Sequence, residues 1–271
     1  MDIKRVLTAV IGLPLVLLGI IFGTPQIISF VIFLIAIICM NEYLNVISKI
    51  CKPIKWVGYL STIIVFIVSI VETSISEKII IFGIPTILLI LFLHIIITDM
   101  KITFKDVAYT LLGIIYVTGF ITFLSLIVTS KNGKYLLGYT LITAWTTDIF
   151  AYIAGKYFGK HHFSKVSPKK TIEGCIAGTI AALILGIVYS YILKVLEVID
   201  LNGAQYLYIG IVTLLLSIIS QIGDFTASTI KRAADSKDYG NMLPGHGGML
   251  DRIDSLIFIS PFIYMLSLIL I

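Results

Sequence analysis

Charge is scarce in this chain. Asp, Glu, Lys and Arg make up 13% of its 271 residues, whereas apolar residues make up 58%, and the mean hydropathy is +1.06. Long uncharged runs of this kind exclude an ordinary soluble domain, because about 20 consecutive apolar residues span the hydrocarbon core of a bilayer as a helix. The alternation of polar and apolar residues that a transmembrane barrel needs is absent. The sequence therefore predicts an all-α, polytopic transmembrane helix bundle.

Cysteine and histidine are also few, and they form no reactive or metal-binding pattern. The three cysteines, Cys39, Cys51 and Cys175, are isolated, and two of them lie in apolar runs. We expect them to pack as small apolar residues. No Cys/His cluster suits zinc, and no Ser-His-Asp or Cys-His arrangement is apparent. His94 lies in an apolar span, and His161 and His162 lack a partner at ligand spacing, so structural roles are expected.

The apolar runs predict about nine helical spans within a single domain, residues 1–271. No repeat and no low-complexity linker divides the chain, and no small-x-small cleavage site follows the first run, so an uncleaved first span is expected. The predicted spans are 6–22, 26–47, 57–72, 79–98, 107–129, 137–155, 172–193, 206–224 and 253–271.

The basic residues orient the bundle. With the N-terminus in the cytoplasm, the outer side holds only Lys78, Lys131, Lys134 and Lys194 of the 20 Lys and Arg residues. The positive-inside rule favours this orientation. It puts the two long charged loops, 156–171 and 225–252, on the cytoplasmic side and the C-terminus outside. Because topology explains the spread of basic residues, the pI near 9.0 does not indicate nucleic-acid binding.

The charges that remain gather between residues 228 and 254. A charge at the centre of a membrane helix costs about 2.5–3.5 kcal/mol on insertion scales, so the cluster needs a reason. Asp224, Ser228 and Lys231 are spaced by four and three residues and share a face if the helix continues past Asp224. This predicts a metal ligand, a phosphate or metal contact, and a phosphate clamp. The alternative is an ordinary helix end, with Lys231 and Arg232 as interfacial anchors.

A glycine-rich turn follows, with His246, Gly247 and Gly248, and leads to Asp251 and Asp254. Glycines permit positive φ and close backbone approach, and N–H groups in such turns can cradle anions. Asp251 and Asp254 lie at i and i+3, on one face of the next helix. Capping alone, or an ordinary glycine-rich loop, is the alternative. We expect Asp224 and Asp251 to hold Mg²⁺, which takes one or two carboxylates with waters and substrate oxygens.

Two upstream features complete the set of candidate site residues. Asp148 lies within a predicted span, where an acid is a functional candidate. The loop with Lys169 and Lys170 could capture phosphate, or could reflect only topology and attraction to anionic lipid. Glu42, near the end of the second span, suits an interfacial position.

The block resembles the signature of the phosphatidate cytidylyltransferases, the CDP-diacylglycerol synthases. The similarity is carried, without a gap, by Ser228-x-Ile230-Lys231-Arg232, Lys237-Asp238-x-Gly240, Pro244-x-His246-Gly247-Gly248 and Asp251-Arg252-x-Asp254. Upstream, Asp148 and the run Ser167-Pro168-Lys169-Lys170-Thr171 look like the second block of the family. This chain has Ile149-Phe150 where the family usually has Thr-Gly.

The resemblance implies transfer of a cytidylyl group from CTP to phosphatidic acid in the cell membrane, with the active site on the cytoplasmic side. It also implies Mg²⁺, a second, monovalent cation such as K⁺, and a homodimer. The residues expected to be catalytic are Asp224, Lys231, Arg232, Asp251 and Asp254. Those expected to bind substrate are Asp148, Lys169, Lys170, Ser228, Lys237, His246, Gly247, Gly248 and Arg252.

Two other functions stay open. A related transferase could act on another lipid, such as an ether-linked phosphatidate analogue, because the signature does not fix the tails. A cation-coupled transporter could also carry buried charge, although transporter sites tend to lie near the midplane, often between inverted repeats, and neither feature is seen here.

Overall fold

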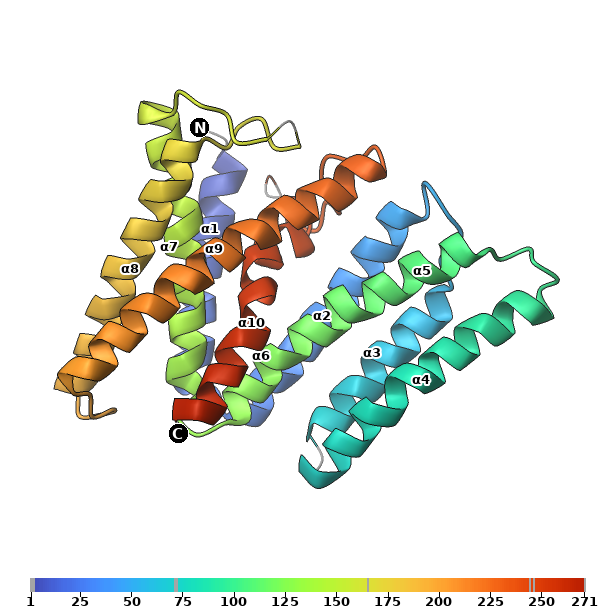
Figure 1. Ribbon diagram of the computed structural model, residues 1–271, viewed down its shortest axis with the longest axis horizontal. Coiled ribbons are helices and arrows are strands. Elements are labelled where there is room, and N and C mark those ends of the chain that lie inside the picture. The colour runs from blue at the N-terminus through green and yellow to red at the C-terminus, as the bar shows by residue number, and fades with distance from the viewer. Residues whose placement is uncertain (1–2, 71–72, 165, 244, 246, 271) are drawn as a thin grey trace. The chain divides into compact units, whose positions relative to one another are not determined.

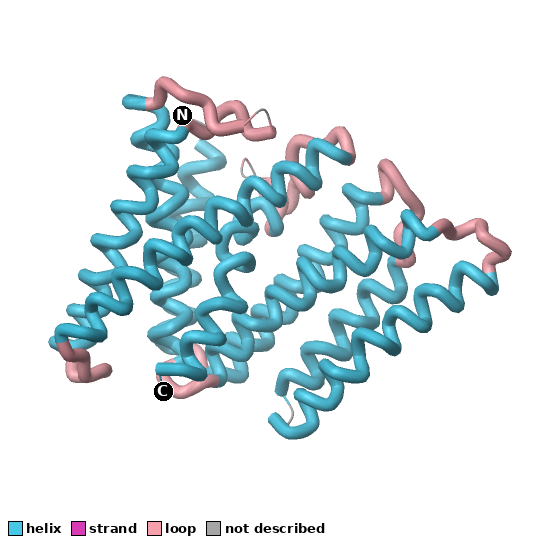
Figure 2. Tube along the Cα trace, in the orientation of Figure 1, coloured by secondary structure: helices cyan, strands magenta, loops and turns pink. Residues whose placement is uncertain are grey.

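A computed structural model describes residues 3–70, 73–164, 166–243, 245 and 247–270. In this part of the chain, helices joined by loops make up the regular structure (Figure 2), apart from two isolated β-bridges. The helices are α1 (Ile3–Phe22), α2 (Pro25–Ile47), α3 (Lys55–Ile70), α4 (Thr73–Ile97), α5 (Phe104–Gly113), η1 (Ile114–Gly119), α6 (Phe120–Thr129), α7 (Gly133–Phe158), α8 (Ile172–Val195), α9 (Gly203–Ala233) and α10 (Leu250–Leu270). The all-α prediction is confirmed for these residues.

Several of these helices are long and apolar enough to cross a membrane. Among the described residues there are four, Pro25–Ile47, Phe104–Thr129, Ile172–Val195 and Gly203–Ala233, and the apolar stretches Lys55–Ser69 and Phe82–Ile97 are shorter. The chain is therefore an integral membrane protein with several apolar helices. The count of nine spans and the cytoplasmic N-terminus stay predictions.

Helix α9 is longer than the sequence predicted. The expected span ended at Asp224, where the apolar run stops, but the helix continues to Ala233. Residues 225–233 contain neither glycine nor proline, so nothing interrupts the backbone hydrogen bonds there. The end of an apolar run marks where a helix leaves the hydrocarbon and does not mark where the helix ends. The predicted charged loop 225–252 shrinks accordingly to residues 234–249.

The chain forms two compact units. Unit 1 comprises Met1–Ser130 and Lys231–Ile253, and unit 2 comprises Lys131–Ile230 and Asp254–Ile271. Helices α9 and α10 each contribute residues to both units. The single functional domain expected from the sequence stays a prediction.

In unit 1, helix α2 packs against α3 and against the segment formed by α5, η1 and α6, while α3 also packs against α4 (Figure 1). Tyr43 of α2 is fully buried, and its hydroxyl donates to the carbonyl of Tyr109, at 2.9 Å. The tyrosine ring fills the space where Gly113 has no side chain, since a Cβ there would lie 2.3 Å from Cε1 of Tyr43. The segment η1, which is a π-helix, begins directly after Gly113. Tyr43 thus fixes the position of α2 against α5.

In unit 2, helix α7 packs along α8, and polar side chains link both to α9. The hydroxyls of Thr147 and Ser217 lie 2.8 Å apart. Ser217 donates to Thr179 at 3.2 Å, and Gln221 donates to the same hydroxyl at 2.9 Å. Hydrogen bonds of this kind are typical of interfaces between membrane helices. They hold the part of α9 from which Asp224 extends.

The contact between Tyr43 and Gly113 predicts a stability effect. Gly113→Ala should destabilise unit 1 by about 1–3 kcal/mol, because an added methyl group must displace a fully packed ring. The measurement is the thermal midpoint of the purified protein in detergent. Gly83→Ala, where a Cβ would meet nothing within 4 Å, is the matched control and should leave the midpoint unchanged or raise it slightly. A midpoint for Gly113→Ala equal to that of the control would contradict the packing argument.

Candidate active site

The last turn of α9 and the first turn of α10 contribute a buried ion pair. The Lys231 ammonium lies 2.6 Å from Oδ1 of Asp251, and the side chains are only 11% and 3% exposed. Both residues belong to unit 1. Because α9 extends past Asp224, Asp224, Ser228 and Lys231 occupy successive turns of the same helix, as their spacing predicted.

The second oxygen of Asp251 is also engaged. Oδ2 accepts the backbone N–H of Tyr239 at 2.8 Å and that of Gly248 at 3.0 Å. The Lys231 ammonium also lies 5.3 Å from the centroid of the Tyr239 ring. Hydrogen bonds to an ionised carboxylate are stronger than those between neutral groups. Asp251 therefore fastens the loop, the glycine turn and the end of α9 to the start of α10.

The glycine turn has the backbone conformation that its sequence predicted. Gly245 and Gly247 have φ values of +78° and +88°, which residues with a Cβ rarely adopt. The N–H of Leu243 donates to the carbonyl of Gly247 at 2.9 Å and closes the turn. Pro244 and His246 lie outside the described residues, as does Lys165 in the loop before α8. The Gly248 N–H is taken up by Asp251, so it is not an open anion cradle in this structure.

Glu42 is a component that sequence reasoning missed. Glu42 belongs to α2, and the whole residue is only 6% exposed. Its Oε1 accepts the N–H of Met249 and its Oε2 the N–H of Leu250, both at 2.9 Å. The interfacial depth expected of Glu42 stays a prediction, but its side chain faces the protein interior, because the unpaired N–H groups at a helix start offer it partners there. An acid within an apolar span is a functional candidate by default, and that signal could have identified it.

Unit 2 holds a second charged cluster. The ammonium of Lys170 forms an ion pair with Oδ2 of Asp224, and it lies 4.4 Å from the centroid of the Phe225 ring. Phe163 stacks on Phe225 with centroids 4.7 Å apart. Ser228, one turn beyond Asp224, places its hydroxyl 3.5 Å from Oδ1 of that carboxylate. The cluster thus combines an ion pair with a cation–π contact.

A short ladder positions the Lys170 loop. The N–H of Phe163 donates to the carbonyl of Lys170 at 3.0 Å. His161 contacts Glu173 with Nδ1 and Oε1 2.6 Å apart, and Oε2 of the same glutamate accepts the N–H of Lys160 and of His161. The structural role expected of His161 is therefore supported by a partner that the sequence search did not find.

The other predicted residues differ in how deeply they are buried. Asp148 lies half-buried in α7, one residue beyond Thr147, and Asp254 is buried in the part of α10 that belongs to unit 2. Four predicted residues are exposed: Lys169, Arg232, Lys237 and Arg252. Asp224 and Asp251 belong to different units, so their joint role at a metal stays a prediction, as do the catalytic and binding roles of the whole set.

The two aspartates fit the chemistry of Mg²⁺. Within the described ranges, no group of three or more His, Cys, Asp or Glu residues could hold a metal by itself. Mg²⁺ does not need such a group, because it is usually held by one or two carboxylates with waters and substrate phosphates. A carboxylate has about four acceptor positions. Asp251 uses three of them in its described hydrogen bonds.

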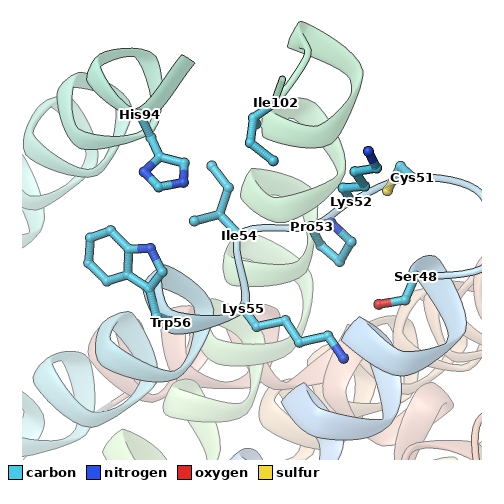
Figure 3. A pocket seen from close by; sticks show the side chains of 9 residues that line it. All are labelled: Ser48, Cys51, Lys52, Pro53, Ile54, Lys55, Trp56, His94 and Ile102. Carbon is cyan, nitrogen blue, oxygen red and sulfur yellow. The ribbon is translucent and has the colours of Figure 1, made fainter. Parts of the chain in front are cut away.

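Two cavities flank the described part of unit 1. One, of about 640 Å³, lies beside Glu42 and is lined by Asn41, Asn45, Tyr59 and the 239–242 segment, together with Ile37 and Ile38. The other, of about 410 Å³, is lined by the loop after α2, including Lys52 and Lys55 (Figure 3). Trp56 and His94 meet there edge to face with centroids 6.0 Å apart, which agrees with a structural role for His94.

Comparison with known proteins accounts for the whole chain. Residues 3–270 match the cytidylyltransferase family. A phosphatidate cytidylyltransferase of Staphylococcus haemolyticus (strain JCSC1435) is 34% identical over 266 residues, covering 97% of each chain. One of Staphylococcus saprophyticus is 32% identical over 265 residues, again covering 97% of each chain. One of Bacillus subtilis (strain 168) is 36% identical over 180 residues, covering 66% of this chain and 64% of that protein. The chain therefore belongs to the cytidylyltransferase family.

Proposed function

We propose that this membrane protein transfers a cytidylyl group from CTP to phosphatidic acid, giving CDP-diacylglycerol and pyrophosphate for phospholipid synthesis. One observation carries the proposal: the signature residues Lys231, Gly248 and Asp251 meet in one buried cluster. The similarity to named phosphatidate cytidylyltransferases over 97% of each chain supports the choice of substrates.

The reaction needs little acid–base chemistry from the protein. The second pKa of a phosphate monoester is about 6, so the phosphate of phosphatidic acid is mostly a dianion at neutral pH. One of its oxygens forms a bond to the α-phosphorus of CTP, and the bond from that phosphorus to the oxygen bridging to the β-phosphate breaks. Pyrophosphate leaves with the electron pair. The main obstacle is repulsion between two anions.

The residues of the site supply what this obstacle requires. Lys231, held in place by Asp251, offers a positive charge whose position is set before substrate arrives. The side chains of Arg232, Lys237 and Arg252 are exposed, so phosphate can reach them from solvent, although Arg232 also donates to the carbonyl of Ser236 at 3.2 Å. Fixed charges of this kind are the main source of rate enhancement in phosphoryl-type transfer.

We further propose that Asp224 and Asp251 hold Mg²⁺, which when bound neutralises phosphate charge as a Lewis acid. The resemblance to the family is the support for a second, monovalent cation such as K⁺ and for a homodimer. In the upstream loop, we propose that Lys169, which is exposed, and Lys170, which is paired with Asp224, contact phosphate. The acyl chains stay in lipid, so the site should open towards the cytoplasmic leaflet of the cell membrane.

The assay is transfer of label from CTP to lipid by the purified protein. CTP labelled at the α-phosphate should give a labelled, chloroform-soluble product that depends on added phosphatidic acid. CTP labelled at the γ-phosphate should give none. An ether-linked phosphatidate analogue and the other nucleoside triphosphates define the substrate range. A protein that transfers no label from α-labelled CTP would contradict the proposal.

Asp251→Asn should abolish turnover and, because it leaves the buried Lys231 without its charged partner, should also lower the thermal midpoint. The amide keeps the shape of the side chain but loses the charge that pairs with Lys231 and the oxygen donor expected for Mg²⁺. Turnover is measured at saturating Mg²⁺, and folding by elution and thermal midpoint in detergent. Asp224→Asn, measured separately, should behave alike. Activity within about tenfold of wild type in either variant would defeat the assignment of that residue.

Lys231→Ala should cost about 2–4 kcal/mol of transition-state stabilisation, or about 30- to 1,000-fold in kcat/KM, by analogy with the loss of one preorganised donor. Removing one partner of a buried ion pair also destabilises the fold, so Lys231→Arg is the more informative variant. It keeps a charge beside Asp251 but changes the shape of the phosphate contact, and we expect at least a tenfold loss.

The matched control for Lys231 is Lys49→Ala. Lys49 is another lysine of unit 1, and its ammonium donates to Ser236 at 2.8 Å in the same loop. The activity of the Lys49→Ala variant should stay within threefold of wild type. An interfacial anchor would tolerate arginine, so full activity of Lys231→Arg would favour the anchor interpretation.

The loops that carry these residues should face the cytoplasm. The bias of Lys and Arg towards one side supports this orientation. In a cysteine-free background, single cysteines at positions 160 and 237 should resist an impermeant thiol reagent in intact cells, whereas one added after residue 271 should react. Labelling of position 237 from outside would place the proposed CTP site beyond the reach of cytosolic nucleotide.

A further inference from the structure

We propose that Glu42 is a positioning residue for the transfer reaction, acting through Asp251 from a helix outside the signature block. The inference rests on the role proposed above for Asp251. Glu42 is separated from its partners by more than 200 residues of sequence. Nevertheless it holds the start of the helix from which Asp251 extends.

The first support is the pair of hydrogen bonds that Glu42 accepts. Met249 and Leu250, its two donors, immediately precede Asp251, and both distances are 2.9 Å. The first N–H groups of a helix have no partner within the helix, and a negative charge there is favourable. Because Glu42 satisfies two of these groups at once, it fixes both the position and the direction of the first turn of α10.

The second support is the shape of the backbone around the carboxylate. A Cβ at Gly248 would lie 2.6 Å from Oε2 of Glu42, and a Cβ at Gly240 would lie 2.7 Å from Oε1. Real Cβ atoms essentially never approach so closely. Two glycines of the signature block therefore leave room for a carboxylate of α2. One of them, Gly248, also donates its N–H to Asp251, so the carboxylates of Glu42 and Asp251 both contact the same turn.

The third support is the rigidity of the helix that carries Glu42. Tyr43, the next residue, is fully buried and its hydroxyl is bonded to Tyr109. A shift of Glu42 along α2 would pull this ring from its place beside Gly113. The chain of contacts thus runs from α5 through α2 and Glu42 to the start of α10, and from there to the pair of Asp251 and Lys231.

This geometry predicts a loss of turnover without a matching loss of CTP binding. Glu42→Gln keeps the size of the side chain but presents an NH₂ group to one of the two N–H donors. The start of α10 should shift, and a misplacement of about 1 Å can cost about 100-fold in rate. We expect kcat to fall about 100-fold, with KM for CTP within about threefold of wild type. Glu42→Asp, which keeps the charge, should recover part of the loss.

Asp106→Asn is the matched control. Asp106 is a second buried carboxylate of unit 1, 4% exposed, and it also accepts two backbone N–H groups, from Thr103 at the start of α5 at 2.7 Å and from Lys52 in the loop before α3 at 2.5 Å. None of its described hydrogen bonds involves the signature block. Asp106→Asn should lower the thermal midpoint about as much as Glu42→Gln but leave kcat within threefold. An equal loss of kcat in both variants would show a general effect on folding and overturn the inference.

Gly240→Ala tests the same contact from the other side. The φ of Gly240 is not positive, so alanine suits its backbone, and the three atoms nearest to the new Cβ would all belong to the side chain of Glu42. Gly240→Ala should lower kcat, and its effect should be less than additive with Glu42→Gln because both disturb one contact. Additive effects, or wild-type kcat in Gly240→Ala, would contradict the proposal.

The two proposals fail in different ways. An active Asp251→Asn would remove the assigned site, whatever Glu42 does. An inactive Asp251→Asn together with a fully active Glu42→Gln would leave the site intact and overturn only the role of Glu42.

Discussion

The site depends on one constraint, which is that a carboxylate buried in an apolar protein must be compensated. An isolated buried charge is so costly that the group would neutralise instead. Asp251, with its side chain 3% exposed, meets the constraint with one ammonium and two backbone N–H groups. These partners come from the end of α9, the loop after it and the glycine turn. Satisfying a single charge therefore fixes three segments around the start of α10.

The Lys170 cluster in unit 2 pairs a carboxylate that is less buried, with the Asp224 side chain 28% exposed. Asp224 lies at the point where α9 runs out of apolar residues, and it is compensated by a lysine from the loop before α8. The ring of Phe225 shields one side of that ammonium. This loop has little regular structure. It is held by the backbone bonds from Phe163 to the carbonyl of Lys170 and from Ile172 to the carbonyl of His161, and by the contact of His161 with Glu173. In both units, a basic residue from outside the carboxylate's own helix turn supplies the missing charge.

These partners mark the limit of what the sequence could predict. Apolar runs located the helices, because burying a run of this length in lipid leaves few other solutions. They could not locate the end of α9, since a helix outside the hydrocarbon follows backbone hydrogen bonding and not hydropathy. Positive φ in the glycine turn was predictable from local chemistry and is confirmed at Gly245 and Gly247. The partners of Glu42 were not predictable, because no local pattern links residue 42 to residue 250.

The arrangement also determines how the site can meet phosphate. Glycine turns and helix starts commonly bind anions through free N–H groups, and that was the expectation for the turn before Asp251. In the structure, the N–H groups of Gly248, Met249 and Leu250 are already taken by Asp251 and Glu42. The protein's own carboxylates thus occupy the positive end of α10. We therefore expect lysine and arginine side chains, together with the proposed Mg²⁺, to meet the negative charge of a bound nucleotide. Because those groups act through position and charge, the rigidity that α2 gives to the start of α10 matters to the chemistry.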